Sequence, residues 1–458
     1  MQKNQSLSRP SYPAQIPPVS FAEACSILAA QSAAILAAHT FKTQSHTLAQ
    51  ALGRVLAAPL FADRDQPPFP RVTRDGFAVR AEDLANGTPL RIVYQLRAGE
   101  PWLSERSPLG PGEAIEIMTG ACLPPGANAV LMVEHVQQVS GTERNGDAHR
   151  TQQQRFILPQ IGRSLNAGEN VVPQGSEARQ GDRLLEPGKR LGPEQIALAA
   201  ACGFSSLAVG IQPKVAILAT GDELVEPSAS KENSGTDVSK QGSPIPSHQI
   251  YNSNSYALAA LVHQAGGIPL RQRPALDRLD DLAACIRRGL KSAPLLLLTG
   301  GVSMGKFDFV KDVLVGMGAE FFFSGVRMQP GKPVTFGRVP ASKGRPERYF
   351  FGLPGNPVSA MVTFRVFVQT LLAALAGERH WQPRTALAKL ATAIHSKPGL
   401  TRFLAAHQDS SQPTPTVSPI QTQGSGDLAA NARANCYVVV PDGCTVLEAD
   451  QIVQVLPH

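Results

Sequence analysis

The stretch LLLLTGGVSMGKFDFVKDVL, residues 295–314, contains the features that decide the fold. Four consecutive leucines are typical of a strand that is buried on both faces, as in a parallel sheet. The strand ends at Thr299, Gly300 and Gly301, and a helical apolar pattern follows. Ligands of open α/β sheets bind at such strand ends, where glycines let backbone N–H groups approach phosphate. The turn and the Ser303 hydroxyl therefore indicate an anion site, although an ordinary strand-to-helix turn accounts equally well for this stretch taken alone.

Strands and helices alternate around this stretch. KVAILAT (214–220) and PVTFG (333–337) predict strands, whereas SNSYALAALVHQAG (253–266) and LDDLAACIRRGL (279–290) have the apolar spacing of helices. A strand that follows a helix back into the same sheet runs parallel to its predecessor. We therefore predict a mainly parallel, three-layer α/β domain over about 211–376.

The regions outside this domain have different textures. Residues 20–38 predict a helix that Ser20 could cap. Short apolar pieces cut by Pro and Gly, from residue 62 onwards, predict a β-rich module. The last part of the chain has a polar loop at 408–422 and ends in strand-like CYVVVPDG and QIVQVL, which favours a small β domain.

Composition limits the class of protein. The 458 residues are too many for one core, and 43 basic against 36 acidic residues give a net charge of +7. That charge suits an anionic ligand, but no Lys/Arg run or RNA-type aromatic motif is present, so a solvated basic surface is favoured over nucleic-acid binding. Six scattered cysteines without a CxxC pair indicate reduced thiols in a cytosolic protein. The longest apolar runs are too short to span a bilayer, so we expect no membrane contact.

A second strand end carries acidic residues. In ILATGDELVEP (217–227), a strand again ends in Thr-Gly, and Asp222 and Glu223 follow. Two carboxylates beside a phosphate-sized turn suit a divalent cation that bridges acid side chains and phosphate. The alternative is that a helix starts here and its dipole favours acidic residues.

A third stretch, MQPGKPVTFG (328–337), places a lysine in a stiff turn. Pro330 and Pro333 restrict the backbone on both sides of Lys332, so the ammonium group is held at the start of a strand. A cation in a fixed position can bind an oxyanion as a point charge. The alternative is a plain turn with an exposed lysine.

A fourth stretch repeats the strand–turn–helix pattern. In FGLPGNPVSAMVTF a strand leads through Pro354, Gly355 and Asn356 into a helix whose first turn carries Ser359. Free backbone N–H groups at a helix start bind anions. Three such turns in one domain, together with Lys332, predict an anion cradle more specifically than any one turn does.

These motifs resemble a known family. TGDEL, IYNSN, TGGVSMG, PGKP and GLPGNPVSA, in this order, are similar to the molybdopterin molybdenumtransferases, the bacterial MoeA proteins and the corresponding domain of gephyrin. DGFAVR (75–80), IMTGACLPPGANAVLMVE (117–134) and QGSGDL (423–428) agree with this resemblance. The resemblance covers nearly the whole chain from about residue 20 and is specific as an ordered set.

The resemblance implies an α/β multidomain protein and an elongated homodimer. The implied site lies between the α/β domain of one protomer and the β-rich module of its partner. The implied segments are a disordered lead-in (1–19), a discontinuous mixed linker domain (20–61 and 156–210), a β-rich inserted module (62–155), a molybdopterin-binding α/β domain (211–376) and a C-terminal β domain (377–458).

The reaction that the resemblance implies is the last step of molybdenum cofactor biosynthesis. Molybdenum from molybdate is inserted into adenylated molybdopterin, and AMP is released with the assistance of Mg²⁺. The implied partners are a second copy of the chain, the enzyme that supplies adenylated molybdopterin, and molybdoenzymes that accept the cofactor. The cysteine pattern described above predicts a cytoplasmic location for this reaction.

The resemblance also assigns residues, position by position. The catalytic set is Asp75, Thr119, Glu223 and Asp308, of which Glu223 and Asp308 also bind the metal. Molybdate is assigned to Lys332, Arg402 and Ser425. The substrate-binding set is Asp222, Thr299, Gly300, Gly301, Ser303, Pro330, Lys332, Pro333, Pro354, Gly355, Asn356 and Ser359.

Several positions depart from the family pattern. Lys306 stands where family members usually have an acid, and one hypothesis is that Lys306 substitutes for part of a cation's charge and lowers the Mg²⁺ dependence. The other hypothesis is a catalytically weakened paralogue that binds pterin, nucleotide or the molybdenum cofactor as a carrier or scaffold. The further departures are Pro70, Arg71, Val72 and Arg74 for Asp, Asn, Ser and Met, Gln329 for Lys, and Asp427 for an apolar residue. A usual basic run is also lost in VVPQGSE (171–177), where Glu177 stands near the acid position of the family.

Overall fold

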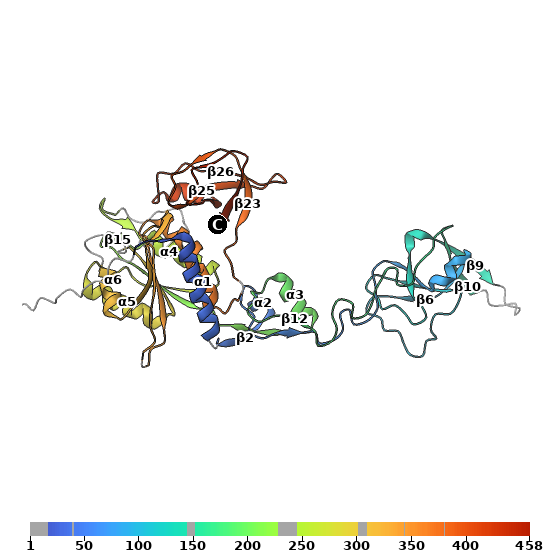
Figure 1. Ribbon diagram of the computed structural model, residues 1–458. Coiled ribbons are helices and arrows are strands. Elements are labelled where there is room, and N and C mark those ends of the chain that lie inside the picture. Colours follow the sequence, from blue (N-terminus) through green and yellow to red (C-terminus); the bar gives the residue numbers. More distant parts are fainter. Residues whose placement is uncertain are drawn as a thin grey trace, which may run out of the picture.

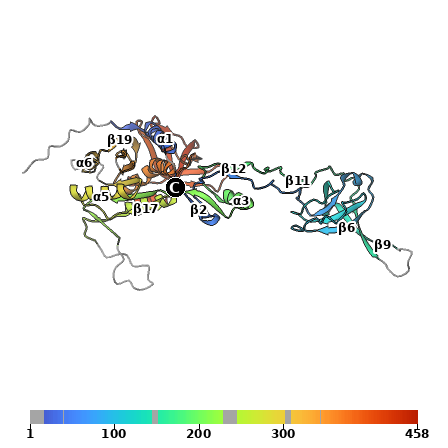
Figure 2. The same cartoon turned by 90° about the horizontal axis from the view of Figure 1, so that it is seen from below.

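The protein is elongated, with the largest domain at one end and a β module at the other (Figure 1). A narrow linker connects the two ends, and the view from below shows the same order along the molecule (Figure 2). The structure is a computed structural model, and it describes residues 17–38, 41–143, 152–227, 245–300, 309–342, 344–379 and 381–458.

The strand order of the central sheet determines where a ligand can bind. The parallel strands lie in the order β17-β14-β18-β22, followed by β21 and β19 as an antiparallel edge. From β14 the chain goes first to the neighbour on one side, β17, and then to the neighbour on the other side, β18. The carboxyl ends of β14 and β18 therefore flank a switch point, where open α/β sheets form a crevice. The bounds are β14 (Lys214–Ala219), β17 (Ile268–Arg271), β18 (Leu295–Thr299), β19 (Glu320–Ser324), β21 (Thr335–Val339) and β22 (Arg348–Leu353).

Helices cover both faces of this sheet, so the predicted three-layer α/β fold is confirmed. Leu295 and Leu297 of β18 pack into the core on one face, and Leu296 and Leu298 pack into the core on the other. This two-sided burial explains the run of four leucines. One face carries α5 (Leu279–Ser292) and α6 (Phe309–Gly316); the other carries α1 (Phe21–Ala38), α4 (Ser253–Gln264), α7 (Pro357–Thr363) and α8 (Gln369–Leu375).

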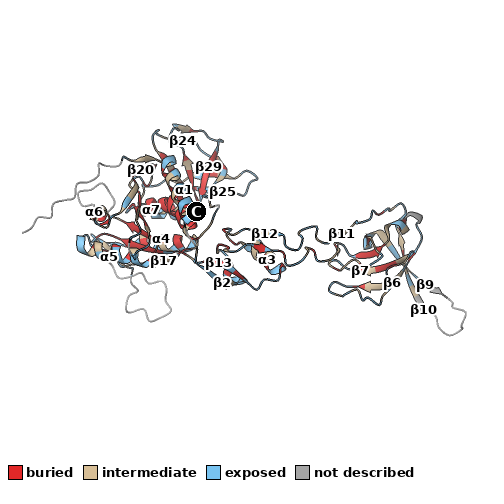
Figure 3. Cartoon of the chain, turned by 60° about the horizontal axis from the view of Figure 1, so that its bottom comes forward, coloured by how far each residue is buried: buried red, intermediate tan, exposed pale blue. Residues whose placement is uncertain are grey.

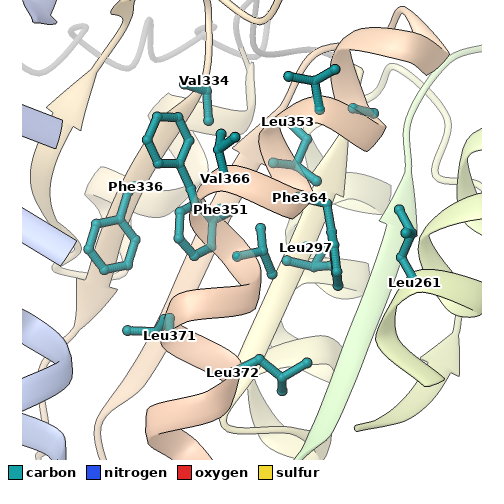
Figure 4. Packing of buried hydrophobic residues seen from close by; sticks show 14 of the residues in the cluster. Leu261, Leu297, Val334, Phe336, Phe351, Leu353, Phe364, Val366, Leu371 and Leu372 are labelled. Atoms are coloured by element: carbon teal, nitrogen blue, oxygen red, sulfur yellow. The ribbon is translucent and has the colours of Figure 1, made fainter. Parts of the chain in front are cut away.

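Aromatic packing consolidates the larger of these cores. Figure 4 shows Phe336 and Phe351 of the sheet beside Phe364 and Leu371 of the helical run that follows Asn356. The helix predicted to follow Asn356 is confirmed, and the structure inserts a π-helical segment, Phe364–Val368, between α7 and α8.

Two helices correct the expectation that every apolar stretch is too short to span a bilayer. By length and composition, α1 and the helical run Pro357–Leu375 both qualify as membrane spans. However, 72% of Pro357–Leu375 is buried inside the protein. Its apolar character is therefore accounted for by its place in the core.

The N-terminal helix is confirmed, but it packs in an unexpected place. Ser20 Oγ accepts the Glu23 N–H, and Glu23 Oε2 accepts the Ser20 N–H, which is a capping box. We expected 20–61 to join 156–210, and α1 instead buries Leu28 and Ile35 in the α/β core. Residue Val19, assigned to the lead-in, pairs as a strand with Val326. The other domain boundaries stay predictions.

Two-stranded ribbons carry the chain out to the β module. These ribbons are antiparallel pairs of distant segments, and α3 (Pro193–Ala201) begins with a proline, which is favoured at the first position of a helix. Figure 3 shows buried residues in the two ends of the molecule and mainly exposed or intermediate residues along the connection. The elements are β2 (Thr43–Thr47) with β13 (Ser206–Gly210), α2 (Leu48–Ala51), β3 (Leu60–Phe61) with β12 (Arg183–Leu185), and β4 (Arg71–Val72) with β11 (Val171–Val172).

The β module confirms the predicted β-rich texture. Its six strands have the order β8-β5-β7-β6-β10-β9, and two apolar clusters lie against this sheet. The strands are β5 (Gly76–Val79), β6 (Leu90–Leu96), β7 (Glu113–Ile117), β8 (Ala129–Met132), β9 (Val136–Glu143) and β10 (Gln152–Pro159), with short 3₁₀ helices at Ala81–Asn86 and Val133–His135.

The C-terminal domain is a small closed barrel. The pairings run β25-β26-β23-β29-β27 and back to β25, and β20 and β1 extend the sheet beside β25. We predicted the region 408–422 as a polar loop, but it contains the strand β26. Only Val417 of this strand is buried, so the sequence lacks the apolar alternation by which a strand is recognised. The bounds are β1 (Val19–Ser20), β20 (Val326–Gln329), β23 (Ala386–Leu390), β25 (Thr401–Asp409), β26 (Thr416–Pro419), β27 (Cys436–Val440) and β29 (Ile452–Pro457).

An arginine clamp joins the linker to the α/β domain. Arg190 donates from Nε and Nη2 to Glu378 Oε2, at 3.0 and 2.7 Å, and from Nη1 to the Gly53 carbonyl at 2.7 Å. The side chains of Arg190 and Glu378 are only 27% and 12% exposed. The Arg379 N–H also donates to the Gly188 carbonyl. These bonds hold the linker against the end of α8.

We expect Arg190→Gln to lower the free energy of unfolding by about 1–3 kcal/mol, because it leaves the Glu378 carboxylate without its partner in a mostly buried place. The matched control is Arg183→Gln, whose ion pair with Glu186 is 54% and 64% exposed and should contribute little. Urea denaturation of both variants checks this. Equal, small losses in the two variants would contradict the clamp.

Candidate functional site

A pocket of about 660 Å³ lies between the α/β domain and the C-terminal barrel. A volume of this order is typical of small-molecule sites. Its walls come from segments that lie far apart in the sequence. Eight of the predicted residues line it, namely Pro330, Lys332, Pro333, Pro354, Asn356, Ser359, Arg402 and Ser425.

The turn that carries Lys332 is held rigidly. The Val326 N–H donates to the Lys332 carbonyl at 2.9 Å, and the turn packs so closely on α7 that a Cβ at Gly331 would lie 2.5 Å from Thr363. Gly331 has a φ of +111°, which only glycine adopts easily. The Lys332 side chain is exposed and has no ion-pair partner within the described ranges. Its ammonium group is therefore available to an anion.

Arg402 offers one edge of its guanidinium to the pocket. Its Nη1 donates to the carbonyls of Lys397 and Leu400, at 2.7 and 3.2 Å, so the side chain is anchored on its own turn. Strand pairing places Gln329 beside Arg402. A neutral amide therefore occupies the position where the family pattern has a further cation.

The barrel closes over the start of α7 through the Ser425 loop. Asn356 Nδ2 donates to Ser425 Oγ at 2.7 Å, and the Val358 N–H donates to the Ser425 carbonyl. Asp427 accepts the N–H groups of Ala430 and Gln423, and these bonds hold the pKa of Asp427 below its ordinary value. Asp427 thus caps α9 (Leu428–Arg433) and shapes the loop, which gives this departure a structural role.

Two strand ends of the sheet are clasped by one side chain. Asn254, in the first turn of α4, donates from Nδ2 to Thr299 Oγ1 at 2.9 Å and to the Gly355 carbonyl at 2.6 Å. The Thr299 hydroxyl in turn donates to the Pro354 carbonyl. The turns after β18 and β22 are therefore fixed side by side. We did not predict Asn254 as a site residue, although its place in the IYNSN motif was a usable signal.

The acidic strand end gains a third carboxyl that the sequence did not indicate. The Asp277 N–H donates to Asp222 Oδ1 at 3.0 Å. Burial, together with the charges of Asp222 and Glu223, raises the pKa of Asp277. The separation of 55 positions between Asp222 and Asp277 explains why no local pattern revealed this contact.

Four predicted or discussed residues, Gly301, Ser303, Lys306 and Asp308, lie outside the described residues. Within the described ranges, no three His, Cys, Asp or Glu side chains come together to enclose a metal ion. Mg²⁺ usually takes only one or two protein carboxylates and completes its shell with water and substrate phosphates. The exposed carboxylates of Asp222 and Glu223 fit that donor set.

Asp75 and Thr119 meet each other but not the pocket. Thr119 donates from its N–H at 2.7 Å and from its hydroxyl at 2.8 Å to Asp75 Oδ1, and these bonds hold the pKa of Asp75 below its ordinary value. Both residues lie in the β module, at the opposite end of the molecule from Lys332 (Figure 1). One chain alone does not bring the two predicted groups together.

Comparison with known proteins agrees with this arrangement. Residues 19–203 match the MoeA N-terminal region (domains I and II), residues 216–374 match a probable molybdopterin-binding domain, and residues 387–458 match the MoeA C-terminal region (domain IV). A molybdopterin molybdenumtransferase of Bacillus subtilis is 33% identical over 421 residues, which is 91% of this chain and 90% of that protein. The chain belongs to the molybdopterin molybdenumtransferase family.

Other members of the family are similar over the same length. The Haemophilus influenzae molybdopterin molybdenumtransferase is 30% identical over 91% of this chain and 95% of its own. The crystal structure of a molybdopterin biosynthesis MoeA protein from Pyrococcus horikoshii superposes with a TM-score of 0.72, at 25% identity, over 96% of this chain and all of that chain.

One departure from the family pattern, Arg71, pairs with a nearby carboxylate. Arg71 donates to Glu177 at 2.9 Å, so its added positive charge is offset locally. Both side chains are about half exposed, and the pair therefore contributes little stability.

The rest of the substituted segment packs against the turn that carries Thr119. The Gly120 N–H donates to the Val72 carbonyl, and the Val72 N–H donates to the Ala121 carbonyl. Arg74 is exposed and has no ion-pair partner in the described part of the chain. It is thus a free cation next to Asp75.

We expect Thr119→Val to raise the pKa of Asp75 towards its ordinary value, because the hydroxyl bond is lost while the backbone N–H bond remains. A depressed pKa stabilises the folded state above the ordinary pKa of the group, and this contribution disappears as the pH falls through the folded value. Carboxyl ¹³C NMR titration measures the pKa, and Thr73→Val is the matched control. An Asp75 pKa unchanged by Thr119→Val would contradict the role of the Thr119 hydroxyl in lowering that pKa.

Proposed function

We propose that the chain is a molybdopterin molybdenumtransferase that inserts molybdenum from molybdate into adenylated molybdopterin and releases AMP. The observation that carries this proposal is the pocket in which Lys332, Arg402 and Ser425 meet. These residues come from three segments of a chain whose relatives over nine-tenths of its length are named for this activity. We place this reaction in molybdenum cofactor biosynthesis in the cytoplasm.

The three residues suit a tetrahedral oxyanion. Lys332 supplies a compact point charge, and Arg402 supplies the N–H groups that its turn leaves unused. Ser425 Oγ already accepts from Asn356, so its own proton is free to donate to a molybdate oxygen. Charge-assisted bonds of this kind are stronger than neutral ones. The pocket is much larger than one molybdate, which leaves room for the end of the organic substrate.

Asp222 and Glu223 are the described residues that would hold Mg²⁺, with Asp308 as the further ligand that the resemblance implies. The ion, when bound, neutralises phosphoryl charge during cleavage of the phosphoanhydride. The chain's own contribution at this edge is positional. Asn254 holds the two strand-end turns together, and the Asp277 N–H orients the Asp222 carboxylate.

A homodimer is part of the proposal. Asp75 and Thr119 belong to the β module and Lys332 to the α/β domain, and these two parts lie at opposite ends of the molecule (Figure 1). If all of them act on one substrate, the β module of a second copy must supply Asp75 and Thr119. The proposal also includes two kinds of transient partner, the enzyme that supplies the adenylated substrate and the molybdoenzymes that accept the product.

A carrier or scaffold that binds the cofactor without turnover is the second candidate. The observation that favours it is the substituted segment around Arg71 and Val72, which packs directly on the turn of Thr119. A carrier would bind the adenylate and release no AMP.

We expect the purified protein to release AMP from adenylated molybdopterin only when molybdate and Mg²⁺ are present. Lys332→Met should lower kcat/KM for this reaction by about 10- to 100-fold, because a preorganised cation at the oxyanion is lost. Lys389→Met is the matched control, since Lys389 pairs with Asp450 on the barrel surface. Tight binding of the adenylate without AMP release would contradict the transferase proposal and support the carrier proposal.

A further inference from the structure

The wall of the pocket under the barrel contains a buried polar side chain to which the resemblance assigns no role. Asn431 belongs to α9, and it lines the pocket although it is only 7% exposed. An asparagine amide offers one acceptor atom and two N–H donors. Buried polar groups of native proteins are nearly always hydrogen-bonded, so the partners of this amide need an account.

The oxygen atom of the Asn431 amide is already engaged. Tyr437 of β27 donates from its hydroxyl to Asn431 Oδ1 at 2.9 Å. Tyr437 is 1% exposed, and its ring packs on His458 with the ring centres 4.5 Å apart. The donor is therefore held in one place by packing, and it fixes the orientation of the amide.

A cation determines which way this hydrogen bond runs. Burial raises the pKa of Tyr437, whereas the charge of the nearby Arg365 guanidinium acts in the opposite direction. The hydroxyl therefore keeps its proton. It turns that proton away from Arg365, because a guanidinium can only donate. The proton thus points to the amide oxygen of Asn431, and the Nδ2 group must point elsewhere.

The Nδ2 group of Asn431 is open to the pocket. It donates to no other group in the described part of the chain. It is also absent from the set of described polar atoms that are shut off from solvent without a partner. An atom that has no protein partner but still reaches solvent, in a residue of the pocket wall, faces the pocket.

The course of α9 brings this N–H group to the Ser425 side of the pocket. Asp427 caps the helix and accepts the Gln423 N–H, which closes the loop that carries Ser425. Asn431 stands four positions after Asp427, so the two side chains share one face of the helix. Side chains of a helix lean towards its N-terminus, where this loop lies. Ser425 and Asn431 therefore belong to the same part of the wall.

The charges of the wall favour an anion in front of Asn431. Lys332 and Arg402 are cations of the wall, and α9 contacts α7, the helix on which the Lys332 turn packs. Asp427 is the one carboxylate among the described residues of the wall, and its two oxygens accept backbone N–H groups. Gln329 offers only a neutral amide. An oxyanion is therefore the class of ligand that a further N–H donor in this wall suits.

We propose that Asn431 donates to the oxyanion as a fourth, neutral donor. Tyr437 is the positioning residue, since its hydroxyl turns the Asn431 Nδ2 group into the pocket. The other three donors are Lys332, Arg402 and Ser425. The inference rests on the proposed function for the identity of the anion, molybdate. A tetrahedral oxyanion presents four oxygen atoms, so donors from four positions of the wall hold it in a defined orientation.

Asn431→Asp tests the donor with almost no change of shape. The carboxylate still accepts from Tyr437, but it cannot donate and it adds negative charge. At pH 8 the variant should therefore bind molybdate about 10- to 100-fold more weakly, the loss expected for a hydrogen bond to a charged group. Asn431→Leu removes the donor without adding a charge and should weaken binding by about 10-fold. Isothermal titration calorimetry of the full chain with molybdate alone measures both affinities, and thermal denaturation verifies the fold.

A double-mutant cycle separates positioning from packing. Tyr437→Phe removes the bond that orients Asn431 and should weaken molybdate binding by about 2- to 5-fold. In the Asn431→Leu background the same change should leave the affinity unaltered, because no amide is left to orient. The matched control is Asn435→Asp, since Asn435 bonds to Gln408 and lies outside the pocket wall. Its molybdate affinity should equal that of the wild type.

The outcomes separate this inference from the proposed transferase. Unchanged molybdate affinity of the two Asn431 variants overturns the inference, whether or not the chain releases AMP. A wild type that binds no molybdate also overturns it, as does a loss in Tyr437→Phe that persists in full in the Asn431→Leu background. A loss in both Asn431 variants that abolishes the effect of Tyr437→Phe supports the inference, and it does so even for a carrier that binds molybdate without releasing AMP.

Discussion

Burial of β18 on both of its faces is the constraint on which the rest of the structure depends. Because Leu295 and Leu297 pack into one core and Leu296 and Leu298 into the other, helices must cover both sides of the sheet. Parallel neighbours with crossover helices satisfy that requirement, and they bring the carboxyl ends of β14, β18 and β22 to one edge. The strand-end turns with Thr220, Thr299 and Gly355 can therefore be clasped into one site.

The site is polarised along its length. Carboxylates gather at the sheet edge, where Asp277 joins Asp222, whereas Lys332 and Arg402 face the pocket under the barrel. The barrel is part of the site because β20 pairs with β25, which carries the Lys332 turn and Arg402 into contact across the domain boundary.

The elongated shape of the protein separates two groups of predicted site residues. Asp75 and Thr119 keep a well-formed hydrogen-bonded pair in the β module, although the segment just before them departs from the family pattern. Arg71 and Glu177 neutralise each other, so part of that departure is compensated within the linker. Arg190 holds the other end of the linker on the α/β domain through its bonds to Glu378.

The sequence by itself indicated the family, the fold class and part of the pocket wall, because strand ends, glycine turns and helix starts are local patterns. It also predicted the capping of α1 by Ser20, which depends on neighbouring residues alone. Only the tertiary structure decided that α1 packs on the α/β core, that Asp277 joins Asp222, and that Asn254 spans two turns. These contacts join residues that lie tens to hundreds of positions apart in the sequence. A local spacing pattern contains no information about contacts over such separations. The bond from Tyr437 to Asn431 was likewise invisible in the sequence, since it depends on how α9 lies against β27.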